Sequence, residues 1–584
     1  MRQERDLQMK ILKNVVRKAP SLVALAACAG LTLSQVAAQA ASSTAAATGP
    51  VQPLALSVVA PITQCANLAT VDISAGVGAP TLVSSAEVVD DGKSAAYCSV
   101  KVTIDSYARF ELRLPQRGWT QRLLFGGGPG AQADAGVDLS QFATVSWEDL
   151  GRRQNEDVLA NEYRSQIYAG YKGMHMQVVA AKALLVKFYG QAQRFAYFNA
   201  CSNPGREGLI EAQRFPKDFD GVAAGCPPLN ITLNNGLWHA WNVLTNNPGG
   251  QPIITADKLP ILHEAVLGAC DAADGATDRI VSDPFACRVP FEKVECRPGL
   301  NTATCLSAEQ VRVARELYRG PHDAAGHKLA PSGVLPGSEL AWTATIVPGG
   351  RFGGPQEAWT ATEKALRSHY SLPALDKSWT LDQVRFDLET LRETTRYNYL
   401  HDATNTDMTP FARAGGKLIL WMALGDTNVL PMSTILYYQK MRQHTGAALT
   451  DSFARFYLVP GVYHCGGGDG PILENVLLPL MAWVERGIAP DALPAAHVPG
   501  KGFGPPRSDV APAAADLTRP IWPYPIIGRY TGRGDVRAMT SWTRGPARPV
   551  PAALLEWAGN DLYRADAHQW CAPVAEGMTC TARP

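Results

Sequence analysis

The sequence predicts an α/β fold, in which helices flank a mainly parallel β-sheet, and three observations lead to this class. Short apolar runs that end in glycine-rich or polar turns recur along the chain, as buried strands followed by loops do. Longer stretches with a helical pattern stand between or after these runs. The alternation of strand and helix is typical of a parallel sheet, and 584 residues suffice for several domains or for one large domain with an insertion.

Four apolar runs carry the predicted strands that matter most for function. In chain order they are "RLLFGGGPG", "AYFNACSNPG", "GGKLILWMALGD" and "ARFYLVPGVYH". The helical stretch "GMHMQVVAAKALLVKFYG" lies between the first two runs, and "ENVLLPLMAWVERG" follows the fourth. Ligands of open α/β sheets bind beyond the carboxyl ends of the strands. We therefore expect the four loops that follow these strands to share one edge of the sheet.

The N-terminus has the pattern of an export signal. Six basic residues within the first 18 positions precede an apolar run from Leu22 to Leu33, and Ala38-Gln39-Ala40 is an A-x-A cleavage pattern. We therefore expect a signal peptide over residues 1–40 and a secreted or periplasmic protein. A lipoprotein signal over residues 1–27 is the alternative, because "LAAC" resembles a lipoprotein box that would leave Cys28 as a lipid anchor.

The middle of the chain has a different character. Between about Asn230 and Asp407, helical segments, acidic turns and cysteines replace the strand signals. We predict a main domain over residues 41–229 and 408–545, an inserted domain over residues 230–407 and a C-terminal extension over residues 546–584. A net charge of +1 gives no electrostatic case for nucleic-acid binding, and no central stretch is apolar and long enough to span a bilayer.

The chain has 12 cysteines, and most of them should pair in an exported protein. Spacing suggests the pairs Cys65–Cys98, Cys270–Cys287, Cys296–Cys305 and Cys571–Cys580. Once Cys28 is set aside with the signal, Cys201 and Cys465 remain as a long-range pair and Cys226 as a buried thiol. A C-x-x-C pair is absent from the sequence, which makes zinc a poor explanation.

The stretch "ACSNPG", after the second strand, contains a candidate nucleophile, Ser202. In α/β-hydrolases a G-x-S-x-G turn presents the nucleophile between a strand and a helix. Here Ala200 and Pro204 replace both glycines, although proline is tolerated in a first helical turn. The alternative is that Ser202 only caps the helix.

Two further residues complete a candidate triad. Asp426 follows the third strand, and His464 lies in the turn "GVYHCGGG" after the fourth. The order Ser202, Asp426, His464 is the chain order of α/β-hydrolases. Cys201 precedes the serine directly and Cys465 follows the histidine directly, so a bridge between them would hold nucleophile and base together.

This arrangement predicts acyl transfer. Ser202 would attack an acyl carbon, His464 would carry the proton, and Asp426 would orient the imidazole. The oxyanion hole needs two N–H donors, for which we expect Asn203 and, in "FGGGPG", Gly128. A phosphate-cradling turn is the alternative for the glycine run, but a G-x-x-x-x-G-K-[ST] pattern is absent.

Together these motifs resemble the tannase and feruloyl esterase family. The similar phrases are "AAKALLVKFYG", "CSNPGREGLIEAQRFP", "FARAGGKLIL", "YLVPGVYHCGGG", "LMAWVERGIAPD" and "RPIWPYPIIGRYTGRGD". The resemblance covers most of the chain from about Cys65 to Asp535. The resemblance implies an α/β-hydrolase fold in which the inserted domain is a lid, a disulfide between the cysteines beside the serine and the histidine, and hydrolysis of carboxylic esters.

The resemblance also implies one structural Ca²⁺ ion in the lid, at "CDAADGATDRI". The implied ligands are the carboxylates of Asp271, Asp274 and Asp278 and the backbone carbonyls of Ala276 and Ile280. Calcium prefers several hard oxygen ligands, which an acidic turn supplies. The alternative is a solvated acidic loop that the Cys270–Cys287 disulfide closes.

The chain departs from the family pattern at several positions. Met422-Ala423 stands where a His-Gly pair is usual, and Trp522 stands where "RP-x-C-PYP" has cysteine. We expect an exported serine esterase for small esters of aromatic acids, such as feruloyl or galloyl esters. The alternatives are an acyltransferase or a bulky-ester hydrolase with the same triad, and a non-catalytic secreted binding protein with an inherited hydrolase fold.

Overall fold

The computed structural model describes residues 51–90, 92, 95–126, 137–147, 162–298, 300, 302–349, 354–371, 374–499, 514–575 and 577–582. Residues 51–584 cluster into one compact unit. The predicted boundaries at 229/230, 407/408 and 545/546 stay predictions within this unit. The described helices include none that is both long enough and apolar enough to cross a membrane.

A central sheet has the strand order β1-β2-β3-β5-β4-β6-β7-β8-β9. The strands are β1 (Thr81–Val89), β2 (Tyr97–Ile104), β3 (Ala108–Pro115), β4 (Arg122–Gly126), β5 (Phe142–Trp147), β6 (Phe195–Cys201), β7 (Gly221–Gly225), β8 (Lys417–Ala423) and β9 (Ala454–Val459). From β5 to β9 all neighbours are parallel, whereas β1, β2, β3 and β5 pair in antiparallel fashion. The predicted α/β class is therefore confirmed, and the four predicted strands are β4, β6, β8 and β9.

Helices cover both faces of the sheet. The helices close to it are α4 (Gly173–Tyr189), α5 (Asn203–Arg214), α15 (Pro431–Thr445), α16 (Ala447–Phe453) and α17 (Leu477–Arg486). Consecutive side chains of β6 point to opposite faces, so Phe198 packs against Gly208 of α5 while the Tyr197 hydroxyl donates to Glu485 of α17 at 2.8 Å. Glu485 also forms a buried ion pair with Arg122 at the start of β4, which fixes α17 to the sheet.

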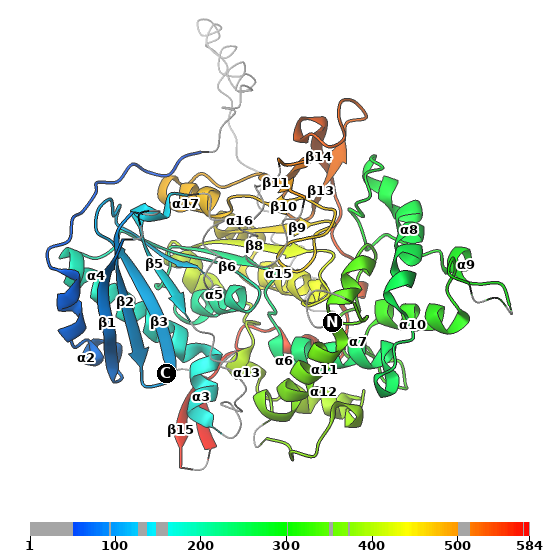
Figure 1. Cartoon of the computed structure of the whole chain (residues 1–584), viewed down its shortest axis with the longest axis horizontal. Helices are drawn as coiled ribbons and strands as arrows, with labels where there is room; N and C mark the ends of the chain where they lie inside the picture. The colour runs from blue at the N-terminus through cyan, green and yellow to red at the C-terminus, as the bar shows by residue number, and fades with distance from the viewer. Residues whose placement is uncertain are drawn as a thin grey trace, which may run out of the picture. The chain divides into compact units, whose positions relative to one another are not determined.

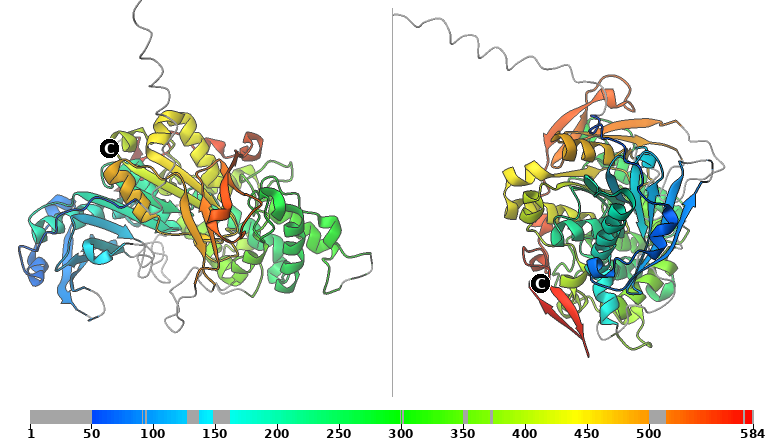
Figure 2. Two further views of the ribbon diagram at one scale, coloured as in Figure 1. Left: turned by 90° about the horizontal axis from the view of Figure 1, so that it is seen from above. Right: turned by 90° about the vertical axis from the view of Figure 1, so that its left-hand side faces the viewer.

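The lid segment, residues 230–407, lies between β7 and β8 and is helical. Its α-helices are α6 (Ile231–Leu233), α7 (His239–Asn246), α8 (Leu259–Cys270), α9 (Phe291–Val294), α10 (Ala308–Arg319), α11 (Gly354–Lys364), α12 (Leu388–Thr394) and α13 (Asn398–His401). A π-helical turn, Asn234–Trp238, joins α6 to α7, and α14 (Thr409–Arg413) leads into β8. These helices group together on the side away from β1–β3 (Figure 1; Figure 2, left).

The remaining elements are short. They are α2 (Ser74–Val77) and α3 (Tyr163–Ile167) near the N-terminus, and then β10 (Ile472–Leu473), β11 (Leu493–His497), β12 (Leu517–Ile521), β13 (Ile526–Tyr530), β14 (Trp542–Ala547), α18 (Ala552–Leu555), β15 (Trp570–Val574) and β16 (Gly577–Thr581). The last hairpin, β15–β16, is closed by the Cys571–Cys580 disulfide.

The C-terminal extension is tied to both other parts of the unit. In the lid segment, the Lys328 carbonyl accepts from the Ala558 N–H at 3.0 Å. Beside the sheet, Arg214 at the end of α5 donates to the Gln569 carbonyl at 2.8 Å. The extension therefore connects the lid segment with the helix that begins beside Ser202.

Candidate active site

Ser202 occupies a sharp turn between β6 and α5. Its backbone has φ 69° and ψ −141°, a left-handed conformation that non-glycine residues rarely adopt. The turn is held by two backbone hydrogen bonds, from Ser202 N to the Gly225 carbonyl at 2.8 Å and from Arg206 N to the Ser202 carbonyl at 3.1 Å. This is the geometry of a nucleophile elbow, in which a strained residue projects its side chain beyond the sheet.

Neighbouring backbone segments approach this turn closely. The positions that must be glycine for this reason are not the two glycines of the G-x-S-x-G motif. A Cβ atom at Gly205 would lie 2.8 Å from the Gly225 carbonyl oxygen, and one at Gly225 would lie 2.3 Å from the Trp421 ring. Ala200, by contrast, is accommodated as a buried residue, and Pro204 lies in the first turn of α5, where the loss of an N–H is tolerated. The two departures from G-x-S-x-G are therefore compatible with the elbow.

The three predicted triad residues lie together in the structure. His464 Nε2 is 2.8 Å from Ser202 Oγ, and His464 Nδ1 is 2.8 Å from Asp426 Oδ2. The carboxylate of Asp426 can only accept, so Nδ1 carries the proton and the lone pair of Nε2 faces the serine hydroxyl. Asp426 is fully buried, and its Oδ1 accepts from the Asn428 and Val429 N–H groups at 2.8 and 2.9 Å. These bonds fix the orientation of the carboxylate.

A disulfide joins Cys201 to Cys465, with the two Cα atoms 6.0 Å apart. It covalently connects the ends of β6 and β9, next to Ser202 and His464. The four pairs predicted from spacing also form, and Cys226 is a buried free thiol. The Cys226 sulfur lies within 4.8 Å of both disulfide sulfurs. Burial first, and then the charge of Asp426, raise the pKa of this thiol, so it is held in its protonated and unreactive form.

One of the two predicted oxyanion donors is described by the structure. Asn203 is the first residue of α5, so its N–H lies at the positive end of the helix dipole. Its side chain is fixed, because Oδ1 accepts from Arg206 Nε at 2.7 Å. Gly128 lies outside the described residues.

The predicted calcium ligands lie in the loop after α8, and most of them are buried although residues between them are exposed. Asp271 and Asp274 are 4% and 6% exposed, and the residues that would offer carbonyls, Ala276 and Ile280, are also buried. Asp278 Oδ1 is buried without a hydrogen-bond partner, and burial raises the pKa of both Asp274 and Asp278. The unpartnered buried oxygen and the hard-oxygen donor set fit Ca²⁺. Arg519 of β12 already forms an ion pair with Asp278 Oδ2.

Two clusters in the described residues bring three metal-ligand atoms within 4.8 Å of one another, and neither of them is the Asp271 loop. The first consists of Cys201, Cys226 and Cys465, two of which are joined in the disulfide and cannot act as thiolate ligands. The second consists of His175 of α4, Glu211 of α5 and Asp218, which follows α5. Burial and the Asp218 charge raise the pKa of Glu211 well above its usual range, which favours the protonated form of Glu211.

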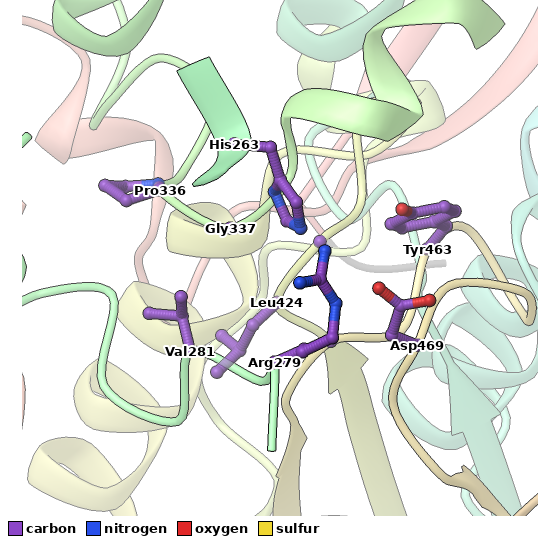
Figure 3. A pocket seen from close by; sticks show the side chains of 10 residues that line it. His263, Arg279, Val281, Pro336, Gly337, Leu424, Tyr463 and Asp469 are labelled. Atoms are coloured by element: carbon purple, nitrogen blue, oxygen red, sulfur yellow. The ribbon is translucent and has the colours of Figure 1, made fainter. Parts of the chain in front are cut away.

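A small polar cavity lies between the lid segment and the loops that carry the acid and the base. Figure 3 shows His263 and Arg279 of the lid segment facing Tyr463 and Asp469 of the loop after β9. His263 is fixed by its Nδ1, which is 2.6 Å from the buried Glu339 carboxylate. The cavity borders Gly425 and Tyr463, which directly precede Asp426 and His464, so it lies behind these residues and not at the reacting atoms.

Sequence reasoning missed the residues by which the lid segment holds the acid loop. Asn234 Nδ2 and His239 Nε2 both contact the Asn428 carbonyl, at 3.0 and 2.8 Å, and Asn234 Oδ1 accepts from Leu430 N at 2.9 Å. On the serine side, Arg206 Nη1 donates to the His401 carbonyl at 2.6 Å. No local pattern marks these residues, because their partners lie 189 to 196 positions away in the sequence.

Comparison with known proteins places this geometry in a family context. A family model described as tannase and feruloyl esterase matches residues 95–544. A mono(2-hydroxyethyl) terephthalate hydrolase from Piscinibacter sakaiensis is 30% identical over 537 residues, which cover 78% of this chain and 85% of the relative. A protein of Aspergillus flavus named "Probable feruloyl esterase B-1" is 27% identical and covers 79% of this chain and 87% of its own length.

Solved structures give the same picture at the level of the fold. Feruloyl esterase B from Aspergillus oryzae superposes with a TM-score of 0.69 at 25% identity, over 82% of this chain and 99% of its own. A tannin acyl hydrolase from Aspergillus niger superposes with a TM-score of 0.61 at 22% identity, over 84% and 93%. The second likeness supports the fold alone.

Proposed function

This chain belongs to the tannase and feruloyl esterase family of carboxylic ester hydrolases, and from this premise we propose that it hydrolyses esters of aromatic acids through an acyl-enzyme on Ser202. The observation that carries the proposal is the unbroken relay from Ser202 Oγ through His464 to Asp426, with 2.8 Å at each step. A serine that only caps a helix needs neither a base within hydrogen-bond distance nor a buried acid behind that base.

The first half-reaction forms the acyl-enzyme. Ser202 Oγ attacks the ester carbon while His464 Nε2 takes the hydroxyl proton, and the carbonyl oxygen becomes an oxyanion. We expect the Asn203 N–H to stabilise that charge, because it lies at the start of α5. The intermediate then collapses, the carbon–oxygen bond to the alcohol breaks, and His464 returns the proton to the leaving alcohol.

The second half-reaction releases the acid. A water molecule gives a proton to His464 Nε2 and attacks the acyl carbon, and the proton then returns to Ser202 Oγ as the ester bond to the serine breaks. Throughout both steps the buried Asp426 carboxylate keeps the Nδ1–H tautomer of His464 and stabilises the imidazolium.

The chemistry of the relatives supports an aromatic acyl group. Their names identify a hydrolase of a terephthalate ester and feruloyl esterases, and terephthalate and ferulate are both aromatic carboxylates. An acyltransferase would use the same acyl-enzyme but pass it to an alcohol. Added alcohols that capture most of the acyl product in place of water would favour that alternative.

The test is the Ser202→Ala variant, assayed with methyl ferulate and methyl gallate beside wild-type protein. We expect a loss of kcat of at least about 10³-fold with an unchanged melting temperature, because the nucleophile is removed and no core contact is lost. Ser378→Ala, at an exposed lid position, is the matched control and should keep full activity. A Ser202→Ala variant with wild-type turnover would refute the mechanism. Wild-type protein that neither turns over these esters nor reacts with a phosphonate probe would favour a binding protein.

We also propose that the chain is exported to the periplasm or secreted. Five disulfides support this, because such bonds persist in oxidising compartments. The predicted signal over residues 1–40 and the alternative anchor Cys28 lie outside the described residues. N-terminal sequencing of mature protein from the native host distinguishes cleavage after Ala40 from a lipid-modified Cys28, and an intact N-terminus in the cytoplasm would contradict both.

We further propose that Asp271, Asp274 and Asp278, with the carbonyls of Ala276 and Ile280, hold a structural Ca²⁺ ion. The unpartnered Asp278 oxygen and the buried carboxylates support it, since an ion would offset their charges. A chelator should lower the melting temperature of wild-type protein, and added Ca²⁺ should restore it, because an ion that binds only the folded state stabilises that state. An Asp278→Asn control should lose this response, whereas unchanged melting of wild-type protein would refute the site.

A further inference from the structure

Helix α4, helix α5 and the loop after α5 bring together three metal-ligand side chains that take no part in the steps described above. His175 comes from α4, Glu211 from the last turn of α5, and Asp218 from the loop that leads to β7. One ligand atom of each residue lies within 4.8 Å of those of the other two. The eight residues from Asn203 to Glu211 span about 12 Å of helix, so this cluster lies at the end of α5 away from Ser202.

Glu211 is a buried carboxyl group whose oxygens lack partners. The residue is 0% exposed, and neither carboxyl oxygen has a hydrogen-bond partner in the described part of the chain. An ionised Asp218 only accepts hydrogen bonds, so it cannot satisfy an ionised Glu211. Lys182 is directed elsewhere, because its Nζ donates to the Asp218 carbonyl at 2.7 Å. A buried carboxylate without a partner is costly, and Glu211 therefore needs either a proton or a cation.

The other two members of the cluster are held in place by the residues around them. The His175 ring is stacked on Phe215 with the ring centroids 3.7 Å apart, and its Nδ1 is 2.6 Å from Asp218 Oδ2. The Asp218 N–H donates to the Phe215 carbonyl at 2.9 Å, and Lys182 holds the Asp218 carbonyl. Metal ligands are commonly oriented by a surrounding layer of contacts of this kind.

We propose that His175, Glu211 and Asp218 bind a divalent transition-metal ion, for which Zn²⁺ is the best match. One imidazole nitrogen and two carboxylates are a donor set that Zn²⁺ accepts, with a water molecule as the fourth ligand. Ca²⁺ is disfavoured, because it prefers oxygen ligands alone and in larger number. None of the ligands is a cysteine, so the absence of C-x-x-C pairs does not bear on this site.

Binding exchanges a proton for the ion and needs only small movements. Ligand atoms around one Zn²⁺ ion lie about 3–4 Å apart, because each bond is about 2.0–2.2 Å long, so the contact between His175 and Asp218 opens by about 1 Å. Glu211 releases its proton to solvent, and the His175 ring keeps its proton on Nε2 while Nδ1 binds the ion. The ion enters past the His175 ring, whose side chain is 30% exposed. Its positive charge offsets the two carboxylates and suits the C-terminal end of α5.

The experiment titrates the full chain with Zn²⁺ by calorimetry, after treatment with a chelator, dialysis and addition of excess Ca²⁺ to occupy oxygen-only sites. His175→Phe keeps a ring beside Phe215 but removes the nitrogen ligand, and Glu211→Gln keeps the shape of the side chain but removes its charge. Each should bind Zn²⁺ at least about 100-fold more weakly than wild-type protein, since the loss of outer contacts alone costs about 10–100-fold. His497→Phe is the matched control, because His497 Nδ1 also lies 2.6 Å from an aspartate, Asp516, and it should bind like wild-type protein.

The alternative is a Glu211 that only keeps its proton, and it predicts that Zn²⁺ does not bind there. Unchanged Zn²⁺ affinity in both variants, or an equal loss in His497→Phe, would overturn the proposal. Should the variants fail to fold, crystals of wild-type protein soaked in Zn²⁺ still decide. We expect an anomalous scattering peak at the zinc absorption edge between His175, Glu211 and Asp218, and a map without that peak would overturn the site. Neither result bears on hydrolysis at Ser202.

Discussion

At the scale of single residues, the strain at Ser202 depends on how closely neighbouring backbones approach one another. The carbonyl of Gly225, at the end of β7, accepts the Ser202 N–H, and a Cβ at this residue would lie 2.3 Å from the Trp421 ring. A side chain at Gly225 would push β7 and β8 apart at the point where the elbow is anchored. The glycine that matters here belongs to the neighbouring strand, not to the motif around the serine.

Gly225→Ala should therefore destabilise the protein. The added Cβ would lie 2.3 Å from Trp421 ring atoms in the core, and such overpacking costs about 1–3 kcal/mol in unfolding free energy. Urea denaturation measures the change. Gly268→Ala, in α8 with open space around the new Cβ, is the control, which we expect to stabilise by about 0.5–1 kcal/mol. Equal effects of the two substitutions would contradict this packing at Gly225.

The contacts of single residues also explain why the sequence around Ser202 lacks both glycines of the G-x-S-x-G motif. The G-x-S-x-G pattern reports only the residues next to the serine, and Ala200 and Pro204 both fit their positions here. The positions that truly exclude a side chain, Gly205 and Gly225, are set by contacts between β6, α5 and β7. Only one of them is close to Ser202 in the sequence, so no short motif could contain both.

At the scale of elements, the register of the parallel strands brings the proposed catalytic loops together. Cys201 at the end of β6 is opposite Gly225, which is opposite Trp421 of β8, and Ala423 at the end of β8 is opposite Val459 of β9. The four strands with long apolar runs were predictable from the sequence. The central strand β7, "GVAAG", was not, because a short run of glycine and alanine has no apolar signal of its own.

The disulfide at these strand ends should matter for both stability and catalysis. Replacing Cys201 and Cys465 by serine removes a link between residues 264 positions apart, and we expect a loss of about 2–5 kcal/mol in unfolding free energy. Activity should also fall, because His464 is no longer tied to the strand that carries Ser202. Chemical denaturation and kcat with methyl ferulate measure the two effects.

The matched control replaces Cys571 and Cys580, which are only nine positions apart in the terminal hairpin. Because that loop is short and lies away from Ser202, we expect a smaller loss of stability and full activity. The role of the strand-end disulfide would be contradicted if both pairs of substitutions had the same effect.

At the scale of the whole molecule, buried titratable groups near the junction with the lid segment make stability depend on pH. Asp402 is fully buried, and burial raises its pKa to about 7, against hydrogen bonds from Thr232 that lower it. Its neighbour His401 has its pKa lowered to about 3, first by burial and then by the charge of Arg206. Both groups are therefore favoured in their neutral forms when the protein folds.

Asp402 gives the testable case. The folded protein keeps a proton that the unfolded chain loses above about pH 4, so the stability contribution is greatest below that pH and is lost as pH rises through 7. A shift of about three pKa units corresponds to a loss of about 4 kcal/mol in unfolding free energy. In Asp402→Asn the carboxyl group cannot ionise, so unfolding free energy measured in urea should decline less between pH 5 and pH 8. The exposed Asp382→Asn is the control, and a variant at 402 that follows the wild-type curve would contradict the burial argument.

The residues of the candidate site could be predicted from the sequence more fully than the contacts that surround them. Ser202, Asp426, His464 and the cysteine pairs could be predicted because each lies beside a strand signal or a matching cysteine. The contacts of Asn234 and His239 with the acid loop could not, because they depend on how the helical lid segment packs against β8, and helical periodicity gives no information about that packing.

The attachment of the last 39 residues has a consequence for how this protein can be recombined with its relatives. The extension bonds to Lys328 in the lid segment and to Arg214 of the helix that begins beside Ser202. A lid segment transplanted alone would therefore pack against a C-terminal extension whose contacts belong to a different lid segment. The interchangeable module is thus discontinuous in sequence, and chimaeras should transplant residues 230–407 and 546–584 together.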